Sequence, residues 1–285
     1  MSEEAPVLAE RDGPILWLRL NRPDAMNAYT AAMGAALAAG FRRADEDDDI
    51  RVVVLTAKGR VFCAGADVSA GAGAFDTASG EGAKNFGNRT EGRDSDFVSA
   101  MMDCRKPSIV AFNGAAAGVG LTLTLPCDIR IAADTARFGF VFARRGLAPE
   151  AGSAWFLPQL VGLSQALRWC LTGTLFPASE ALDKGLVSEL RPPETLEARA
   201  RELALEIAEN CAPVALALTR RMLWRFGPQA TPAGALAVDA ALNIALGQTA
   251  DVREGVSAFL EKRGPRFPGT VSADFPDTPW WRPAG

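Results

Sequence analysis

The sequence predicts an α/β protein with a helical C-terminal part. Short apolar runs rich in Val, Ile and Leu recur up to about residue 190, and stretches with helical spacing lie between them. Beyond residue 195 nearly all of the chain has helical spacing. We therefore expect two parts: a core over residues 1–195, and a helical region over residues 196–285 that packs on the core or on a neighbouring subunit.

Four apolar runs predict the strands of the core. The first, at residues 15–20, reads ILWLRL and is followed by NRPD, a proline turn that ends a strand. The second, RVVVLTA at residues 51–57, has the β-branched composition of a buried strand. The runs PSIVAFNG at residues 107–114 and CDIRIAA at residues 127–133 complete the set.

Between the first two strands, the sequence TAAMGAALAAGFRRA predicts a helix over residues 30–44. Met33, Leu37 and Phe41 recur at helical spacing, and Thr30 is placed to cap the N-terminus. Residues 70–95 are rich in Gly, Ala, Ser, Asn and charge without a period, which predicts a mobile loop. Four helices are expected in the C-terminal region, at residues 194–210, 213–226, 233–247 and 251–263.

Composition excludes several classes of function. The chain has 285 residues, a formal charge of -4 and a sequence pI near 5.1, so it lacks the basic face that binding of nucleic acid requires. It contains no histidine, which removes histidine triads, metal ligands and proton shuttles. The five cysteines are scattered without a CxxC pair, so we expect free thiols and no metal site.

The N-terminal sequence MSEEAPVLAERDG is acidic and lacks the apolar core of a secretory signal, so we expect a cytoplasmic protein. Residues 107–127 carry no charge, which is long enough to raise a membrane span. Pro, Asn and several Gly and Thr interrupt this stretch, so a buried strand, turn and helix explain it better, and no membrane span is expected.

Two Gly-rich turns follow apolar strands. The first is CAGAD at residues 63–67, and the second is NGAAAGVGL at residues 113–121, which leads into a predicted helix. Two accessible backbone N–H groups from separate turns are what an oxyanion hole needs. Each turn alone is better explained by close packing. A dinucleotide-binding loop is disfavoured, because Leu123 stands where the third glycine of GxGxxG belongs.

Together these motifs resemble the enoyl-CoA hydratase/isomerase (crotonase) family. NRPDAMNAYT, GRVFCAGADVS, NGAAAGVGLTLTLPCDIRIAADTARFGF, PEAGSAWFLPQLVG and FLEKRGPRF occur in the order and spacing of that family, over nearly the whole chain. The resemblance implies a spiral of ββα units, followed by helices that build a homotrimer or a dimer of trimers. It also implies an acyl-CoA thioester as substrate, with no cofactor beyond the coenzyme A that the substrate carries.

The resemblance assigns site residues by position. The backbone N–H groups that hold the thioester carbonyl fall on Ala66 and Val119, where the family often has Gly at the second position. Coenzyme A is expected along the loop from Arg22 to Met26 and along the first turn, and the EKR segment offers a lysine to one of its phosphates, commonly across a subunit interface. The expected coenzyme A contacts are Arg22, Ala25, Met26, Ala64, Ala66, Asp67, Val68 and Lys262.

The sequence departs from the hydratase pattern at both acidic positions. Typical hydratases carry two glutamates there, and this chain has Thr122 and Phe142. Adding water to a 2-enoyl thioester asks one group to activate water and another to manage the α-proton. Neither Thr nor Phe can act as that base, so we expect both side chains only to line the pocket.

Glu150 is the remaining candidate base. It stands in GLAPEAGSAW at residues 146–155, where a carboxylate costs solvation energy unless it is paired, exposed or used. In the isomerase branches of the resembled family, an acidic residue occupies this position. Apolar neighbours such as Trp155, Phe156 and Phe142 are expected to raise its pKa. The structural alternative is an acid that complements a helix N-terminus.

Three functions remain open. The favoured one is a Δ3,Δ2-enoyl-CoA isomerase with Glu150 as its single proton shuttle. The second is an enoyl-CoA hydratase with atypical residues, which the substitutions at 122 and 142 disfavour. The third is a catalytically silent acyl-CoA-binding scaffold subunit. The presence of Glu150 and of the two Gly-rich turns disfavours it.

Overall fold

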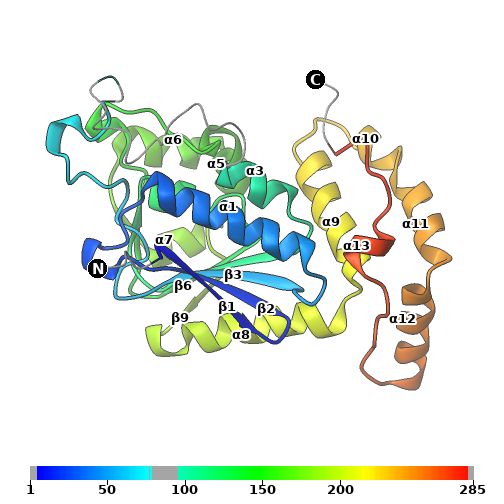
Figure 1. The fold of residues 1–285 in the computed structure, drawn as a ribbon. Helices are drawn as coiled ribbons and strands as arrows, with labels where there is room; N and C mark the ends of the chain where they lie inside the picture. The colour runs from blue at the N-terminus through cyan, green and yellow to red at the C-terminus, as the bar shows by residue number, and fades with distance from the viewer. Residues whose placement is uncertain (1–4, 77, 79–95, 282–285) are drawn as a thin grey trace.

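The computed structural model describes residues 5–76, 78 and 96–281. Its body is built on a six-stranded sheet, and a group of C-terminal helices lies beside it (Figure 1). The strand order is β1-β2-β3-β4-β6-β9, in which β1 and β2 pair antiparallel and the other neighbours pair parallel. The strands are β1 (Val7–Asp12), β2 (Ile15–Leu20), β3 (Val52–Ala57), β4 (Ser108–Phe112), β6 (Ile129–Ala133) and β9 (Glu189–Arg191).

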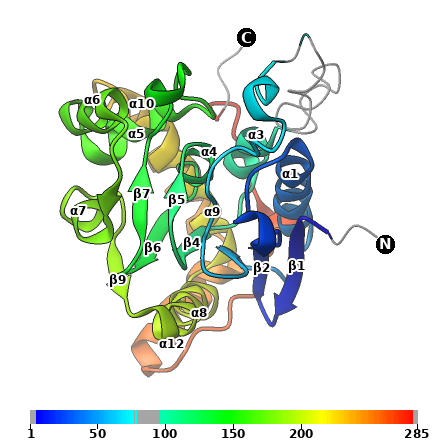
Figure 2. The same cartoon turned by 90° about the vertical axis from the view of Figure 1, so that its left-hand side faces the viewer.

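A second, three-stranded sheet has the order β5-β7-β8 and lies beside β4 and β6 in Figure 2. Its strands are β5 (Ala116–Ala117), β7 (Arg137–Gly139) and β8 (Phe176–Pro177). Aromatic rings fill the space around it: Phe138 meets Phe112 edge-on at 5.0 Å between centroids, and Phe176 stacks on Trp169 at 4.0 Å. The small sheet thereby holds the second Gly-rich turn, because β5 lies within residues 113–121.

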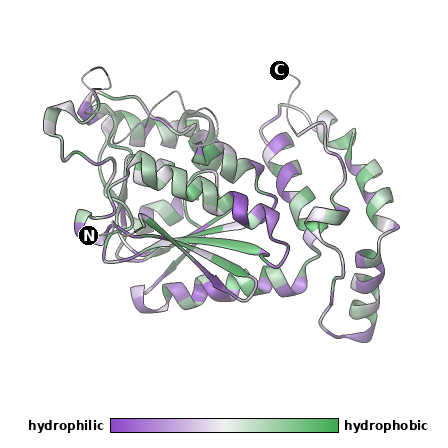
Figure 3. Cartoon of the chain, in the orientation of Figure 1, coloured by the Kyte–Doolittle hydropathy of each residue, from purple (hydrophilic) through white to green (hydrophobic). Residues whose placement is uncertain are grey.

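Two long helices cover the large sheet from opposite sides, α1 (Ala31–Glu46) and α8 (Pro193–Asn210) (Figure 1). Every residue of β2 and β3 is buried, as expected for strands that are covered on both faces. The middle strands are accordingly among the most hydrophobic ribbons in Figure 3. Because α8 buries Leu196, Ala200, Ala204 and Ala208, it belongs physically with the sheet. The domain boundary at residue 195 itself stays a prediction.

The remaining helices of the described residues fall into two groups. Five accompany the body: α3 (Phe97–Asp103), α4 (Val119–Thr122), α5 (Ser153–Val161), α6 (Leu163–Thr172) and α7 (Ala178–Asp183). Five more follow α8: α9 (Pro213–Phe226), α10 (Ala233–Leu236), α11 (Asp239–Gly247), α12 (Ala250–Glu261) and α13 (Val271–Asp274). None of the helices in the described part of the chain is both long and apolar enough to span a membrane.

The predicted strands are confirmed as β2, β3, β4 and β6, and the predicted first helix as α1. The hydroxyl of Thr30 accepts a hydrogen bond from the N–H of Met33 at 3.3 Å, so the predicted N-cap is also confirmed. The predicted helix over residues 233–247 is wrong in one respect. It breaks into α10 and α11, because Val238 leaves helical geometry with a φ of -120°. Most of the loop predicted over residues 70–95 lies outside the described residues, and a short 3-10 helix η2 (Gly71–Gly73) begins it.

An ion pair joins the C-terminal helices to the body. Arg220 of α9 is buried, and its Nε lies 2.8 Å from a carboxylate oxygen of Asp128, just before β6. The other guanidinium nitrogens donate to the carbonyls of Met101, Met102 and Cys104 at 2.9–3.0 Å. Since every donor nitrogen of this buried group has an acceptor, α9 is held in a defined position against the body.

Candidate active site

A cavity of about 230 Å³ opens where the two Gly-rich turns meet. Five segments line it. They are the end of the loop before α1 with Tyr29, the first turn from Ala64 to Val68, Phe75 after η2, the second turn at Gly118 and Val119, and the stretch from Val141 to Glu150. The cavity therefore brings together Ala66, Val119 and Glu150, three residues that lie within the predicted site.

The two turns pack directly against each other. The N–H of Cys63 donates to the carbonyl of Ala115 at 3.1 Å, and the N–H of Ala117 donates to the carbonyl of Cys63 at 3.0 Å. Only glycine fits at the contact: Gly65 has a φ of +114°, and a β-carbon on Gly120 would lie 2.5 Å from the Cys63 carbonyl oxygen. The glycines thus allow two backbone segments to approach closely enough to serve one ligand.

The two N–H groups predicted to form the oxyanion hole have no acceptor among the described residues. Within residues 5–76, 78 and 96–281, neither the N–H of Ala66 nor that of Val119 donates to a protein acceptor. Val119 is the first residue of α4, and the first N–H groups of a helix have no acceptor inside it. Since α4 has only four residues, the donors come from local backbone geometry and owe little to a helix dipole. The two free N–H groups at one cavity are suited to an anionic oxygen.

Glu150 is half-buried in the turn that precedes α5. Its carboxylate forms no ion pair and accepts no hydrogen bond from any residue that the structure describes. The α5 cap is Gly152, which uses no side chain. Burial raises the pKa of Glu150 above its ordinary value of 4.5. The carboxylate is therefore a stronger base than a solvated glutamate, and the helix-capping alternative has no contact to support it.

Tyr29 is a site residue that the sequence did not reveal. It lines the cavity beside Ala66, since its N–H donates to the Gly65 carbonyl at 2.7 Å and its carbonyl accepts from Asp67 at 3.0 Å. Burial and then the negative charge of Glu150 raise the pKa of Tyr29, so the phenol stays protonated. The position of Tyr29 depends on its β-bridge to Ala66, which is distant in sequence. The sequence around Tyr29 shows no signal for this pairing.

The aromatic neighbours of Glu150 differ from the expected set. Phe142 lines the cavity, as predicted, whereas Trp155 and Phe156 do not. They face the C-terminal helices, where both rings pack on Trp224 at 6.2 and 5.5 Å between centroids. Thr122 is also misplaced by the sequence reasoning. It is fully buried in α4 with its hydroxyl 3.5 Å from the Val119 carbonyl, and it is not part of the cavity lining.

The loop expected to hold coenzyme A lies against the first turn. The N–H of Ala64 donates to the carbonyl of Met26 at 3.1 Å, which places this loop beside that turn. Met26 and Val68 are half exposed, and their apolar side chains offer a surface for a ligand. Arg22 and Asp67 form an ion pair at 2.9 Å, so both help to fix the loop. Contact of these residues and Ala25 with coenzyme A stays a prediction.

Lys262 is distant from this cavity within its own chain. It ends α12 in left-handed geometry with a φ of +54° and is exposed. In both ribbon views, α12 lies on the opposite side of the molecule from the cyan segment that follows the first turn (Figures 1 and 2). If Lys262 binds a coenzyme A phosphate, that coenzyme A belongs to a neighbouring subunit.

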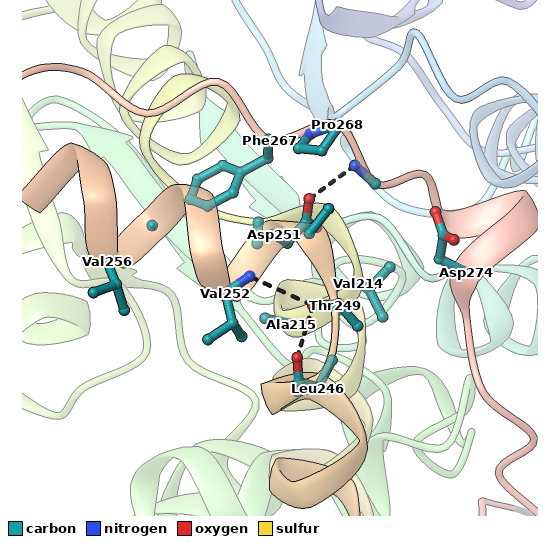
Figure 4. Close-up of a pocket in the computed structure, with 14 residues that line it drawn as sticks. Val214, Ala215, Leu246, Thr249, Asp251, Val252, Val256, Phe267, Pro268 and Asp274 are labelled. Carbon is teal, nitrogen blue, oxygen red and sulfur yellow. Dashed lines mark hydrogen bonds between the residues drawn. The ribbon is translucent and has the colours of Figure 1, made fainter.

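A second cavity, of about 420 Å³, lies among α9, α11, α12 and the segment before α13 (Figure 4). Its polar side chains already have partners. Asp251 accepts a hydrogen bond from the Gly269 N–H at 2.8 Å, Thr249 donates to the Leu246 carbonyl at 2.7 Å, and Asp274 accepts from the Thr270 N–H at 2.8 Å. This cavity has no free reactive group among the described residues, so we assign the chemistry to the cavity with Glu150.

Nucleophilic and metal chemistry find no support in the described residues. Cys63 lies at the first turn, but burial raises the pKa of its thiol to about 12, so it stays a thiol at neutral pH. All five cysteines are free, and no cluster of potential ligands in the described part could hold a metal ion. Glu150 and the two N–H groups remain as the candidate reactive groups of this cavity.

The profile of the enoyl-CoA hydratase/isomerase family matches residues 10–270 of the chain. The chain belongs to the enoyl-CoA hydratase/isomerase family. An enoyl-CoA hydratase of Alternaria alternata is 38% identical over 265 residues, which cover 91% of this chain and 86% of that relative. The 1,2-epoxyphenylacetyl-CoA isomerase of Escherichia coli K12 is 34% identical over 269 residues, which cover 92% of this chain and 98% of the relative.

Solved structures of the family confirm the predicted fold. A probable enoyl-CoA hydratase/isomerase from Mycobacterium abscessus superposes with a TM-score of 0.82 and 35% identity, over 93% of this chain and 99% of the other. An enoyl-CoA hydratase from Mycobacterium tuberculosis H37Rv gives a TM-score of 0.82 and 34% identity, over 94% of this chain and all of the other. The chain therefore has the crotonase fold with a C-terminal helical region.

Proposed function

We propose that this enzyme is a Δ3,Δ2-enoyl-CoA isomerase in which Glu150 is the only proton shuttle. One observation supports it most strongly. A half-buried carboxylate without a partner among the described residues lines the same cavity as two backbone N–H groups that are also free. A base that faces an oxyanion hole can move a proton next to a thioester carbonyl.

The reaction follows from these three groups. The Glu150 carboxylate removes a proton from the α-carbon of a 3-enoyl-CoA, and the electron pair moves onto the thioester oxygen. The resulting dienolate is stabilised by the N–H groups of Ala66 and Val119. The Glu150 carboxyl then returns the proton at the γ-carbon, which leaves the double bond between the α- and β-carbons. The raised pKa of Glu150 suits both steps, because the same group must accept and then release a proton.

Hydration is the second candidate, because relatives of 34–38% identity are named enoyl-CoA hydratases or a 2,3-dehydroadipyl-CoA hydratase. Hydration needs more catalytic groups in this cavity than isomerisation does. Water must be activated and the α-carbon protonated, yet Phe142 is apolar and Thr122 does not line the cavity. Glu150 alone would have to serve both steps. The proposed isomerisation needs only one carboxylate.

A matched pair of substrates separates the two reactions. 3-Hexenoyl-CoA and 2-hexenoyl-CoA are offered separately, and the absorbance of the conjugated thioester is followed. Isomerisation of the first ester raises this absorbance, and hydration of the second lowers it. We expect the isomerisation rate to exceed the hydration rate at equal substrate concentration. Faster hydration than isomerisation would replace this proposal with the hydratase assignment.

We also propose that the chain assembles as a homotrimer or a dimer of trimers through its C-terminal helices. Supporting this, large apolar side chains remain exposed there in the single chain, including Phe259 at 81% and Leu260 at 72% of their surface. Light scattering at micromolar concentration measures the mass. A monodisperse monomer would contradict the proposal.

A further inference from the structure

Arg145 is the only basic residue among the described residues that line the active-site cavity. The other polar side chains there are Tyr29 and Glu150, and the remaining lining is apolar or glycine. The long coenzyme A chain is expected along the first turn. Arg145 is exposed where it lines the cavity, and its guanidinium has no role in the proton transfer proposed above.

The neighbouring arginine shows what a structural arginine does in this turn. Arg144 donates from Nε to the Thr172 carbonyl at 2.8 Å, and its stem packs on Gly173, where a β-carbon would lie 2.9 Å from its Cγ. The Arg145 side chain makes only one hydrogen bond to a described residue, from Nη1 to the Val141 carbonyl at 3.3 Å. It has no ion-pair partner in the described part of the chain, so most of its donors are available.

Arg145 does not form an ion pair with Glu150. The pKa of Glu150 is raised by burial, whereas a guanidinium in contact would lower it. The cavity therefore presents a base and a separate cation. A ligand that matched both would place a carbon acid near Glu150 and an anion near Arg145.

The span between the oxyanion turns and Arg145 is short. A β-carbon on Gly118 would lie 3.7 Å from the Val141 side chain, and the Val141 carbonyl is the acceptor of Arg145. One residue thus links the second oxyanion turn to the guanidinium. Phe142 and Leu147 add apolar lining beside it, which suits a few methylene groups.

We propose that Arg145 binds a carboxylate at the far end of a short acyl chain, so that the preferred substrates are CoA monothioesters of short dicarboxylic acids. Guanidinium pairs with carboxylate through two parallel N–H···O bonds, which gives direction as well as attraction. This substrate class rests on the proposed acyl-CoA chemistry at Glu150. It adds a specificity residue to that reaction and leaves the proton shuttle unchanged.

Binding of saturated esters tests this without any turnover. Hexanoyl-CoA and adipoyl-CoA, the latter as the monothioester, have the same chain length and differ in a terminal carboxylate. Calorimetric titration is carried out on the wild type, Arg145→Leu and Arg145→Lys. Arg43→Leu is the control, since Arg43 is exposed on α1 and outside the cavity lining.

We expect the wild type and the Arg43→Leu control to bind adipoyl-CoA about tenfold more tightly than hexanoyl-CoA, as one charge-assisted hydrogen-bonded pair allows. Arg145→Leu should abolish this preference and change hexanoyl-CoA affinity by less than about threefold. Arg145→Lys should keep part of the preference, because it retains the charge without the fork.

Three results would overturn the inference. Equal wild-type affinity for the two esters would show that no carboxylate is recognised. Equal weakening of both by Arg145→Leu would assign Arg145 to coenzyme A or to the fold of the turn. An unchanged preference in Arg145→Leu would make it a solvated arginine. Failure of the wild type to bind either ester would instead remove the proposed acyl-CoA function itself.

Discussion

The cavity and the C-terminal helices of this chain differ in the kind of group that has no partner within the chain's described residues. Around the cavity, the groups without a partner among the described residues include two N–H donors and the Glu150 carboxylate. In the C-terminal region, the described polar groups of the second cavity are paired and the unpartnered surface is apolar. Helix α11 buries none of its residues, although it is largely hydrophobic in Figure 3.

This difference indicates two separate tasks. Free polar groups in an enclosed place are costly to maintain, and they cluster where a ligand completes them. Free apolar surface is completed by another protein surface. We therefore propose that the reaction takes place at the cavity of one chain and that the helices after α8 serve assembly. The two assignments predict that substitutions in one region change rate, and that substitutions in the other change mass.

The largest effect is expected from Glu150→Gln, which keeps the size of the side chain and removes the base. Loss of a general base typically costs roughly 10²–10⁴-fold in rate. We expect isomerisation of 3-hexenoyl-CoA to fall by that factor, while the oligomeric mass and the affinity for hexanoyl-CoA persist. Glu46→Gln, at an exposed position in the last turn of α1, is the matched control and should be fully active. A wild-type rate in Glu150→Gln would leave the cavity without an identified base.

Ala66→Pro removes one oxyanion donor without changing a charge. Losing one such donor costs about 3 kcal/mol, or on the order of 100-fold in kcat. The measurement is kcat for 3-hexenoyl-CoA, with circular dichroism and mass checking that the variant is folded. If Ala66→Pro disturbs the turn, Val119→Pro tests the second donor, because proline is tolerated at the first position of a helix. If Ala66→Pro and Val119→Pro both fold and both turn over at the wild-type rate, the oxyanion assignment is contradicted.

The double variant Phe259→Asp with Leu260→Asp tests the assembly surface. Two charges on this exposed apolar surface should dissociate the oligomer, and light scattering should report the monomer mass. Because Lys262 is expected to reach coenzyme A of a neighbouring subunit, KM should rise by about tenfold, the equivalent of one charge-assisted contact. Arg43→Asp, at an exposed position of α1 in the body, is the control and should keep the oligomeric mass. An unchanged mass in the double variant would place the interface elsewhere.

A smaller effect is expected from Thr122→Val, which removes a buried hydroxyl of nearly the same size. The hydroxyl is 3.5 Å from its acceptor and does not line the cavity, so it contributes little to binding or rate. Turnover should stay within about tenfold of the wild type, a barrier change near 1.4 kcal/mol. A collapse of hydration or isomerisation in this variant would assign Thr122 a catalytic role.

The smallest effect concerns stability. The pKa of Glu150 is raised in the folded protein, so the folded state holds this proton after the unfolded chain has released it. The contribution of Glu150 to stability therefore falls as pH rises above 4.5, and it stays unfavourable above the raised pKa. We expect Glu150→Gln to melt at a higher temperature than the wild type at pH 8, and the difference to shrink towards pH 4. A lower melting temperature at pH 8 would show that the carboxylate has a stabilising partner.

Sequence patterns predicted the parts of the fold that are locally encoded. Buried strands such as β3 and the capped helix α1 carry their own signals in composition and period. Strand β1 was not predicted, because VLAERD is an edge strand that pairs only with β2 and exposes its charged residues. The strands of the small sheet are two or three residues long, too short to show a period.

The site was predicted unevenly for a related reason. Ala66, Val119 and Glu150 lie in recognisable motifs, and the structure brings them to one cavity. Tyr29 joins them through hydrogen bonds to the distant first turn, for which the sequence has no local signal. Arg145 lies only five residues before Glu150, but nothing in the sequence pattern singled it out. The acidic run at residues 45–49 shows the same limit. Such a run is typical of a solvated surface, yet Asp45 pairs with Arg105 at 2.8 Å and Asp48 with the buried Lys106 at 3.5 Å.

Exchange of α-protons with deuterated water tests the central claim, that Glu150 is the base of this cavity, most directly. A saturated ester such as hexanoyl-CoA has α-protons but no double bond to move or hydrate, so the result does not depend on which reaction follows. Mass spectrometry of the recovered ester measures deuterium at the α-carbon. We predict exchange with the wild type and with Glu46→Gln, and none above background with Glu150→Gln. Equal exchange with Glu150→Gln and the wild type would contradict the claim.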